Sequence, residues 1–186
     1  MNKTLTRKIA SVYRKSDKLI VKKKDEGVDG PYWIVSDTYS AFMLCEFDYQ
    51  EFISKYNSYK STENIPLDAE EYSLPGQNYD SPNFDRVIPD IKRDMDLLET
   101  NLKIDYRKVF RDEYGDNLVL LHEKYTDIIP DEWDYVTDET DDNVHLSPVV
   151  IKEGWKLKGL IMPVRPSDNS KPAEAIKAEL TWTDDK

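Results

Sequence analysis

Apolar and polar positions recur along this chain in two periods, and the first stretch has the period of a helix. Between Thr4 and Lys15, apolar side chains return at helical spacing at Leu5, Ile9, Val12 and Tyr13. Basic side chains fall on the opposite side of this segment, at Lys3, Arg7, Arg14 and Lys18. The pattern predicts an amphipathic helix with one packing face and one cationic face.

Short runs rich in β-branched and aromatic residues follow this helix and predict strands. LIVKKK (19–24) and PYWIVS (31–36) are separated by the turn residues DEGVDG, which indicates a hairpin. AFMLCEF (41–47) predicts a third strand, and DYQEFISKYNSYK (48–60) again has helical spacing. Residues 61–83 contain three prolines and many turn-forming residues, so we interpret them as a connection.

The second half of the sequence suggests the same order of elements. Residues 102–104 look like the end of a strand, and Asp105 and Gly115 are suited to begin and end a short helix. One side of that helix would be apolar (Tyr106, Val109, Phe110) and the other basic (Arg107, Lys108, Arg111). Strands are then predicted in NLVLLHE (117–123), HLSPVVI (145–151) and LKGLIMPVR (157–165). A basic helix followed by strands would thus occur twice, without a residue-level repeat.

These elements predict one α+β domain over residues 1–165. Its halves would cover about 1–60 and 84–165, joined by the connection 61–83. Residues 166–186 have low apolar content and are expected to form a C-terminal extension.

The charge is unevenly distributed. The chain has a net charge of -11, yet residues 1–24 contain nine lysines or arginines and one aspartate. Cations concentrated on one surface attract phosphates without regard to base sequence. No segment resembles a secretory signal or is long and apolar enough to cross a bilayer, so we expect a soluble, cytoplasmic protein without a membrane partner.

Candidate catalytic residues are few. His122 and His145 stand in strand-like runs without a catalytic pattern around them, and Cys45 lies in an apolar run typical of a core cysteine. There is no glycine-rich phosphate loop or metal-binding motif, so we expect neither an enzyme nor a cofactor or metal. The acidic stretch PDEWDYVTDETDD (130–142) is interpreted as a solvated loop, with mimicry of DNA phosphates as an alternative.

Three segments together resemble bacterial β sliding clamps, the rings that tether DNA polymerase to its template. They are WIVSDTYSAFML (33–44), PNFDRVIPD (82–90) and GLIMPVR (159–165), and residues 102–121 are similar to the clamp unit before the final strands. The resemblance implies a clamp fold of two helix-plus-strand units with the helices facing DNA. It also implies a processivity factor that holds duplex DNA through phosphates and recruits a DNA polymerase or other replication proteins.

The resemblance also implies two binding sites. The DNA-facing candidates are Lys3, Arg7, Arg14, Lys18, Arg107, Lys108 and Arg111. A pocket for a partner peptide would be formed by Thr38, Tyr39, Leu160, Met162, Pro163 and Val164. Whether Leu160 and Met162 face a peptide or the core is left open at this point.

The sequence departs from the clamp pattern in several places. Thr38 replaces the usual glycine, Ser40 replaces the usual arginine, and the segment 82–90 lies between the two halves of one domain. Clamp chains have two or three domains, so this chain would have to form a homo-oligomer or join a host clamp. Such a compact form is expected of a phage protein.

Two alternatives stand beside the clamp hypothesis. The acidic body is also compatible with a phage inhibitor or DNA mimic that binds a host DNA-processing protein. A small phage structural or adaptor domain is the third possibility, because fold resemblance does not fix function.

Overall fold

A computed structural model describes residues 3–25, 30–59, 64–73, 88–89, 91–115, 117–141, 144 and 146–164. They form an α+β fold built on one sheet with the strand order β4-β1-β2-β3-β10-β9-β8-β5-β6-β7. All strand pairings in the described residues are antiparallel. The predicted class and the antiparallel sheet are therefore confirmed.

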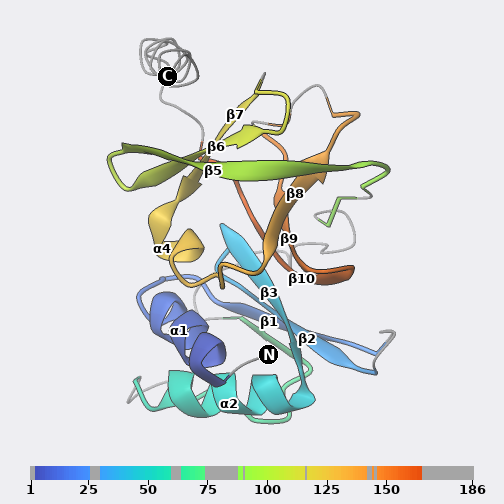
Figure 1. The fold of residues 1–186 in the computed structure, drawn as a ribbon. Helices are drawn as coiled ribbons and strands as arrows, with labels where there is room; N and C mark the ends of the chain where they lie inside the picture. The colour runs from blue at the N-terminus through green and yellow to red at the C-terminus, as the bar shows by residue number, and fades with distance from the viewer. Residues whose placement is uncertain are drawn as a thin grey trace.

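The N-terminal region, residues 3–73, contains two helices that lie side by side over one face of the sheet (Figure 1). Its elements are α1 (Lys3–Tyr13), β1 (Ile20–Lys24), β2 (Tyr32–Ser36), β3 (Ser40–Cys45), α2 (Glu46–Asn57) and β4 (Glu71–Ser73). The first helix, the hairpin, the third strand and the second helix all occur where the sequence predicts them.

Strict alternation in β2 and β3 gives this part of the sheet two apolar faces. Val35 and Phe42 point to the helices, where they pack with apolar side chains of α1 and α2. Ile34 and Ala41 point to the other face, where they form a second buried cluster with Leu160. The sheet is therefore buried on both sides in its centre.

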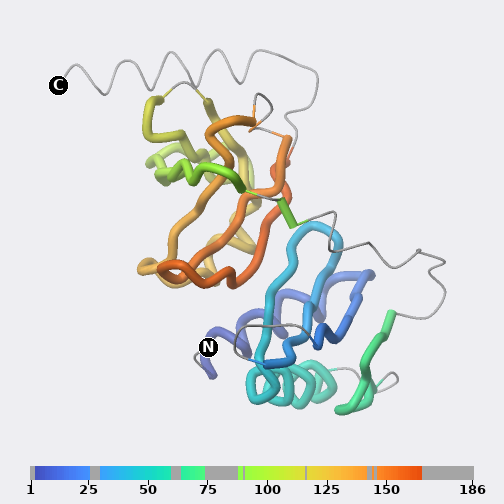
Figure 2. The backbone as a smooth tube through the Cα atoms, turned by 90° about the vertical axis from the view of Figure 1, so that its right-hand side faces the viewer, coloured from blue at the N-terminus to red at the C-terminus, as the bar shows by residue number. Residues whose placement is uncertain are grey.

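The C-terminal region, residues 88–164, contains the other strands of the sheet, β5 to β10. Its elements are β5 (Asp94–Ile104), β6 (Arg107–Asp112), β7 (Leu118–His122), α4 (Glu123–Thr126), β8 (Asp134–Asp138), β9 (Val149–Glu153) and β10 (Lys156–Ile161). The strand β10 pairs with β3 and so joins the two regions. In Figure 2 the N-terminal region forms the lower part of the molecule and the C-terminal region the upper part. After β10, the Val164 amide donates to the Leu120 carbonyl at 2.8 Å, so the chain turns back to β7.

The junction between β3 and β10 requires a glycine. A Cβ atom at Gly159 would lie 2.6 Å from the Ala41 carbonyl oxygen, closer than real contacts allow. The first residue of GLIMPVR therefore permits close backbone approach between the two regions.

The helix predicted over 105–115 is wrong. Residues 94–112 form the β5–β6 hairpin, whose turn contains Asp105 in the left-handed conformation, with a φ of 55°. Val109 and Phe110 are both buried but belong to different apolar clusters, one on each face of the strand. Burial on both faces of a strand outweighs the helical spacing that these residues also satisfy. The second half therefore lacks the basic helix that the sequence suggested.

The acidic stretch is not simply a solvated loop. Residues 134–138 form β8, and Trp133, Val136 and Thr137 are buried. Part of the expected connection, Glu71–Ser73, is β4. His145, Arg165, the extension 166–186 and most of the segment 82–90 lie outside the described residues.

Candidate functional site

The cationic side of α1 lies beside α2 and is partly neutralised there. Arg7 Nε donates to Glu51 Oε1 at 2.7 Å. Lys3 and Arg14 approach aromatic rings in α2 and just after it, at 5.6 and 4.2 Å from the ring centroids. Cation–π contacts of this kind leave the positive charge in place while fixing the side chain.

Two further lysines, one on α1 and one just after it, are more available than those chosen from the sequence. The side chains of Lys8 on α1 and of Lys15 in the turn after the helix are exposed and form no ion pair or hydrogen bond within the described residues. Lys15 follows the end of the helix at Tyr13, and its amide donates to the Val12 carbonyl at 3.2 Å. The exposure of Lys8 could have been inferred from the helical periodicity, but the position of α2, which occupies the Arg7 side, could not.

The structure does not bring the second set of predicted cations to the helices. Arg107, Lys108 and Arg111 lie on β6, in the C-terminal region. Lys108 Nζ lies 3.0 Å from both Glu99 Oε1 and Asp127 Oδ1, and its side chain is 14% exposed. Burial acts to lower the pKa of Lys108, but the hydrogen bonds and charges of these two carboxylates outweigh it and raise the pKa. Lys108 is therefore part of an internal ion-pair network.

Lys18, the remaining predicted DNA contact, follows α1 rather than belonging to it. Its amide donates to Ser16 Oγ at 3.3 Å, and the residue is half-buried. It lies in the connection between α1 and β1, which also contains Lys15.

The predicted partner pocket falls at the junction of β3 and the segment after β10. The Met162 amide donates to the Tyr39 carbonyl at 2.8 Å, so the two predicted walls do meet. Tyr39 is 56% exposed, and Thr38, Met162, Pro163 and Val164 are half-buried. Leu160 is 3% exposed and is a core residue. We call the five accessible residues the junction surface.

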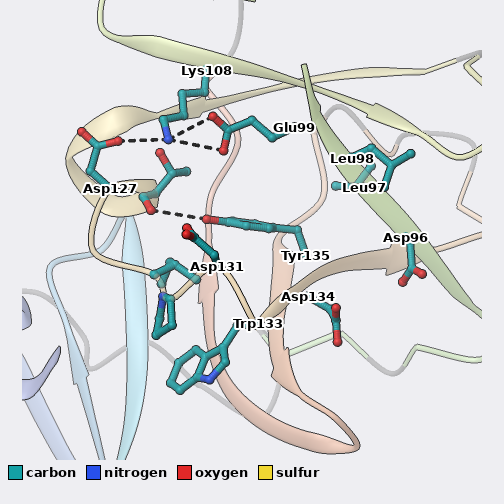
Figure 3. Close-up of a pocket in the computed structure, with 13 residues that line it drawn as sticks. Asp96, Leu97, Leu98, Glu99, Lys108, Asp127, Asp131, Trp133, Asp134 and Tyr135 are labelled. Atoms are coloured by element: carbon teal, nitrogen blue, oxygen red, sulfur yellow. Dashed lines mark hydrogen bonds and ion pairs between the residues drawn. The ribbon is translucent and has the colours of Figure 1, made fainter. Parts of the chain in front are cut away.

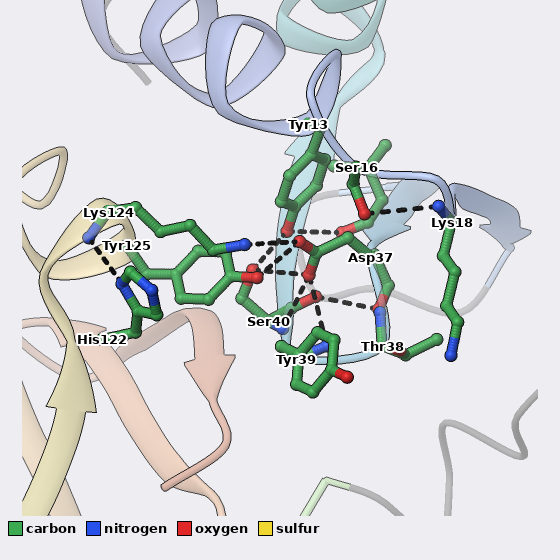
Figure 4. A network of polar contacts seen from close by, with 12 residues as sticks. Tyr13, Ser16, Lys18, Asp37, Thr38, Tyr39, Ser40, His122, Lys124 and Tyr125 are labelled. Atoms are coloured by element: carbon green, nitrogen blue, oxygen red, sulfur yellow. Dashed lines mark hydrogen bonds and ion pairs between the residues drawn. The ribbon is translucent and has the colours of Figure 1, made fainter. Parts of the chain in front are cut away.

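A buried polar network holds this junction surface in place (Figure 4). Asp37 is fully buried, and its Oδ2 accepts a hydrogen bond of 2.5 Å from the Tyr125 hydroxyl of α4. Its Oδ1 accepts from the Tyr39 amide at 3.2 Å and from the Ser40 amide at 3.0 Å. Because Asp37 belongs to the N-terminal region and Tyr125 to the C-terminal region, the network fastens the two together.

Three more side chains complete the network, and the Ser40 hydroxyl joins it by donating to Asp37 Oδ1 at 3.2 Å. The Tyr13 and Ser40 hydroxyls lie 2.9 Å apart, and Lys124 Nζ lies 3.8 Å from Asp37 Oδ2. Burial, and then the charge of Asp37, raise the pKa of both Tyr13 and Tyr125. Both tyrosines therefore remain protonated, and the Tyr125 hydroxyl donates to the buried Asp37 carboxylate.

A pocket of about 470 Å³ opens in the C-terminal region between the β5–β6 hairpin, β8 and the loop before β8 (Figure 3). Its wall includes one lysine, Lys108, and five carboxylates: Asp96, Glu99, Asp127, Asp131 and Asp134. Trp133, Tyr135 and Leu97 supply apolar wall. We call this feature the acidic pocket. The acidic stretch 130–142 indicated the negative charge of this pocket. Its walls could not be predicted from the sequence, because β5 and β8 are far apart in the chain and pair only in the folded sheet.

The remaining candidate residues, His122 and Cys45, each stand directly before a helix. His122 caps α4, because its Nδ1 accepts from the Lys124 amide at 3.2 Å. Cys45 is exposed at the start of α2, so the expectation of a core cysteine is wrong. Within the described residues, no cluster of histidine, cysteine, aspartate and glutamate could hold a metal ion.

No protein-family model, curated protein or solved structure matches this chain. In the part of the chain that the structure describes, no helix is long and apolar enough to cross a membrane.

Proposed function

We propose that this chain is a non-enzymatic DNA-binding protein of the sliding-clamp type that acts in DNA replication. The observation that carries the proposal is the gathering of exposed cations on α1 and in the turn after it, in a chain with a net charge of -11; α1 lies with α2 over one face of an antiparallel sheet. The clamp resemblance implies a basic helix in each half, whereas here α1 and α2 both belong to the N-terminal region.

The chemistry of α1 suits phosphates rather than base edges. Lysines and arginines on an exposed helix face attract the DNA backbone and release counterions, which gives binding without sequence specificity and strong dependence on salt. Lys8 and Lys15 would contact phosphates directly, with Lys3, Arg7 and Arg14 beside them. A local positive face on an acidic protein also orients its approach to DNA and keeps the rest of the surface away.

The backbone at Thr38 supports the clamp resemblance independently of charge. Thr38 stands where clamps usually have glycine, and its φ is 75°. Glycine adopts this left-handed conformation readily, whereas threonine does so at a cost. The turn between β2 and β3 thus has a glycine-like conformation although the residue differs.

The same proposal assigns the junction surface to a replication partner. Tyr39 offers an exposed aromatic ring, and beside it Met162 offers a half-buried thioether that packs against the cluster around Leu160; both groups suit the apolar side chains of a short peptide. To encircle DNA, a single domain of this size would act as a homo-oligomer or within a host ring.

Fluorescence anisotropy with a labelled DNA duplex tests the DNA-binding proposal. The wild-type chain should bind in low salt, and log K should fall linearly with log salt concentration. The double variant Lys8→Gln/Lys15→Gln should bind more weakly, with a salt slope smaller by about 2.

The matched control is Lys92→Gln/Lys103→Gln, which removes the same charge from the C-terminal region and should leave both affinity and slope nearly unchanged. Equal losses in the two double variants would show that only net charge matters. Absence of DNA binding by the wild type in low salt would overturn the proposal.

The junction surface is tested separately by affinity capture from bacterial extract followed by mass spectrometry. Wild type should capture a replication protein such as a polymerase subunit, and Tyr39→Ala should lose it. Tyr106→Ala, which removes another exposed tyrosine, should retain it. Equal capture by the two variants would remove the junction surface from the account.

A further inference from the structure

The acidic pocket carries more negative charge than its own lysine neutralises. Lys108 is already held by Glu99 and Asp127. The other three carboxylates, Asp96, Asp131 and Asp134, are exposed and form no hydrogen bond or ion pair within the described residues. Their charge is directed at whatever enters the pocket from solvent.

The complementary surface occurs on the same chain. Lys8 on α1 and Lys15 in the turn after it are exposed, in the other region of the molecule, and neither pairs with a carboxylate of its own chain within the described residues. The wall also includes two aromatic residues that are already packed: Trp133 is buried beside Lys158, and Tyr135 packs against Phe110. The pocket's remaining carboxylates and the two exposed lysines are therefore opposite charges that lie in different regions of one molecule.

We propose that the acidic pocket of one copy binds Lys8 of α1 and Lys15 of the following turn from a second copy. The contact is heterologous, since two different surfaces meet, so each bound copy keeps one free surface and assembly continues head to tail. Exposed ion pairs are individually weak and screened by salt, so the association should appear in low salt and vanish in high salt.

The inference goes beyond the proposed function and needs no DNA to hold. It does predict competition, because Lys8 and Lys15 cannot contact phosphates and the acidic pocket at once. A self-associated copy would have its α1 lysines covered until duplex DNA displaced the neighbouring copy.

Sedimentation velocity on the full chain tests this proposal with two complementary variants. Lys8→Gln/Lys15→Gln removes the helix contact, and Asp131→Asn/Asp134→Asn removes part of the pocket. Wild type should form species larger than a dimer in low salt. Each variant alone should be a monomer, and their equimolar mixture should form a 1:1 dimer, because each supplies the surface that the other lacks.

Each other result overturns the inference: a wild type that stays monomeric in low salt, a variant that still assembles alone, or a mixture that stays monomeric. The control Lys92→Gln/Lys103→Gln should assemble like wild type.

DNA binding separates this inference from the proposed function. Asp131→Asn/Asp134→Asn keeps the α1 lysines and should still bind DNA. If neither the wild type nor either double variant binds DNA, but the equimolar mixture of the two variants forms the dimer, the proposed function fails and this inference stands. If DNA binding depends on Lys8 and Lys15 but that mixture remains monomeric, the proposed function stands and this inference fails.

Discussion

The two regions of this molecule each contain a cluster of cations, and their secondary structure gives the two clusters different roles. Lys8 projects from α1, whose other side packs against the sheet, and Lys15 lies in the turn after this helix, so both charges remain exposed. On β6, Lys108 lies between Glu99 of the neighbouring strand and Asp127 after α4. The difference teaches that a basic run identifies a binding surface only when the element that carries it leaves the charges unpaired.

The contrast has a simple geometric cause. A strand has neighbours along its edges, so an antiparallel hairpin brings residues such as Glu99 and Lys108 into contact across the ladder. A helix packed on a sheet has one buried side only, and the opposite side meets solvent. The same residue types therefore stabilise the fold in one region and are free for a ligand in the other.

The largest effect is expected where the two regions are fastened together. Asp37→Ala removes the acceptor of the Tyr125 hydroxyl and of the Tyr39 and Ser40 amides, and leaves these donors buried without it. We expect the free energy of unfolding to fall by about 3 kcal/mol or more. Urea denaturation followed by circular dichroism measures this change.

Tyr125→Phe serves as the matched control, because it removes one hydroxyl and keeps the ring. Its cost should be smaller, and the double variant should cost less than the sum of the two single variants, since the residues share one hydrogen bond. Additive costs would mean that Asp37 does not act through Tyr125.

The sequence predicted both helices and the first three strands of the N-terminal region but missed β4, and it was insufficient for the C-terminal region. Helical and strand periods in the N-terminal region are long and unambiguous, and the glycine-containing turn after β1 separates them. Around Val109 and Phe110 the same spacing fits a helix or a doubly buried strand, and only the partners β5 and β7 decide between them. The acidic pocket and the Asp37–Tyr125 bond join residues far apart in sequence, so no local pattern could predict them.

An intermediate effect on stability is expected when one lysine is removed from each cation cluster in turn. Lys108→Gln should lower the free energy of unfolding by about 1–2 kcal/mol, because it breaks two charged hydrogen bonds in a shielded position. Lys8→Gln should change it by less than about 0.5 kcal/mol, since the side chain is exposed. Thermal and urea denaturation of both variants provide the measurement.

The order of the two variants should be reversed for DNA affinity. Lys8→Gln should bind duplex DNA more weakly than wild type, and Lys108→Gln should bind it with nearly unchanged affinity. If Lys108→Gln weakened DNA binding while remaining stable, the distinction between the two cation clusters would be wrong.

The smallest expected effect is a pH dependence at His122. Burial, and then the charge of Lys124, lower the pKa of His122, whose Nδ1 accepts the capping hydrogen bond of α4. A group whose pKa is lowered on folding stabilises fully above its unfolded pKa, about 6.5, and this stabilisation is lost as the pH falls through the lower folded value. Unfolding midpoints measured between about pH 7.5 and pH 5.5 should therefore fall.

His122→Asn keeps a capping acceptor but does not titrate in this range. Its midpoint should fall less than that of wild type over the same pH interval. Identical pH dependence in the two proteins would show that the cap is not the titrating group.

The central claim, that α1 and not β6 faces DNA, is tested most directly by titrating a ¹⁵N-labelled sample with duplex DNA and following the amide NMR signals in low salt. We predict that the signals of α1, around Lys8 and Lys15, shift and broaden, while those of β6, around Lys108, stay in place. Perturbations centred on β6, or on neither element, would contradict the account.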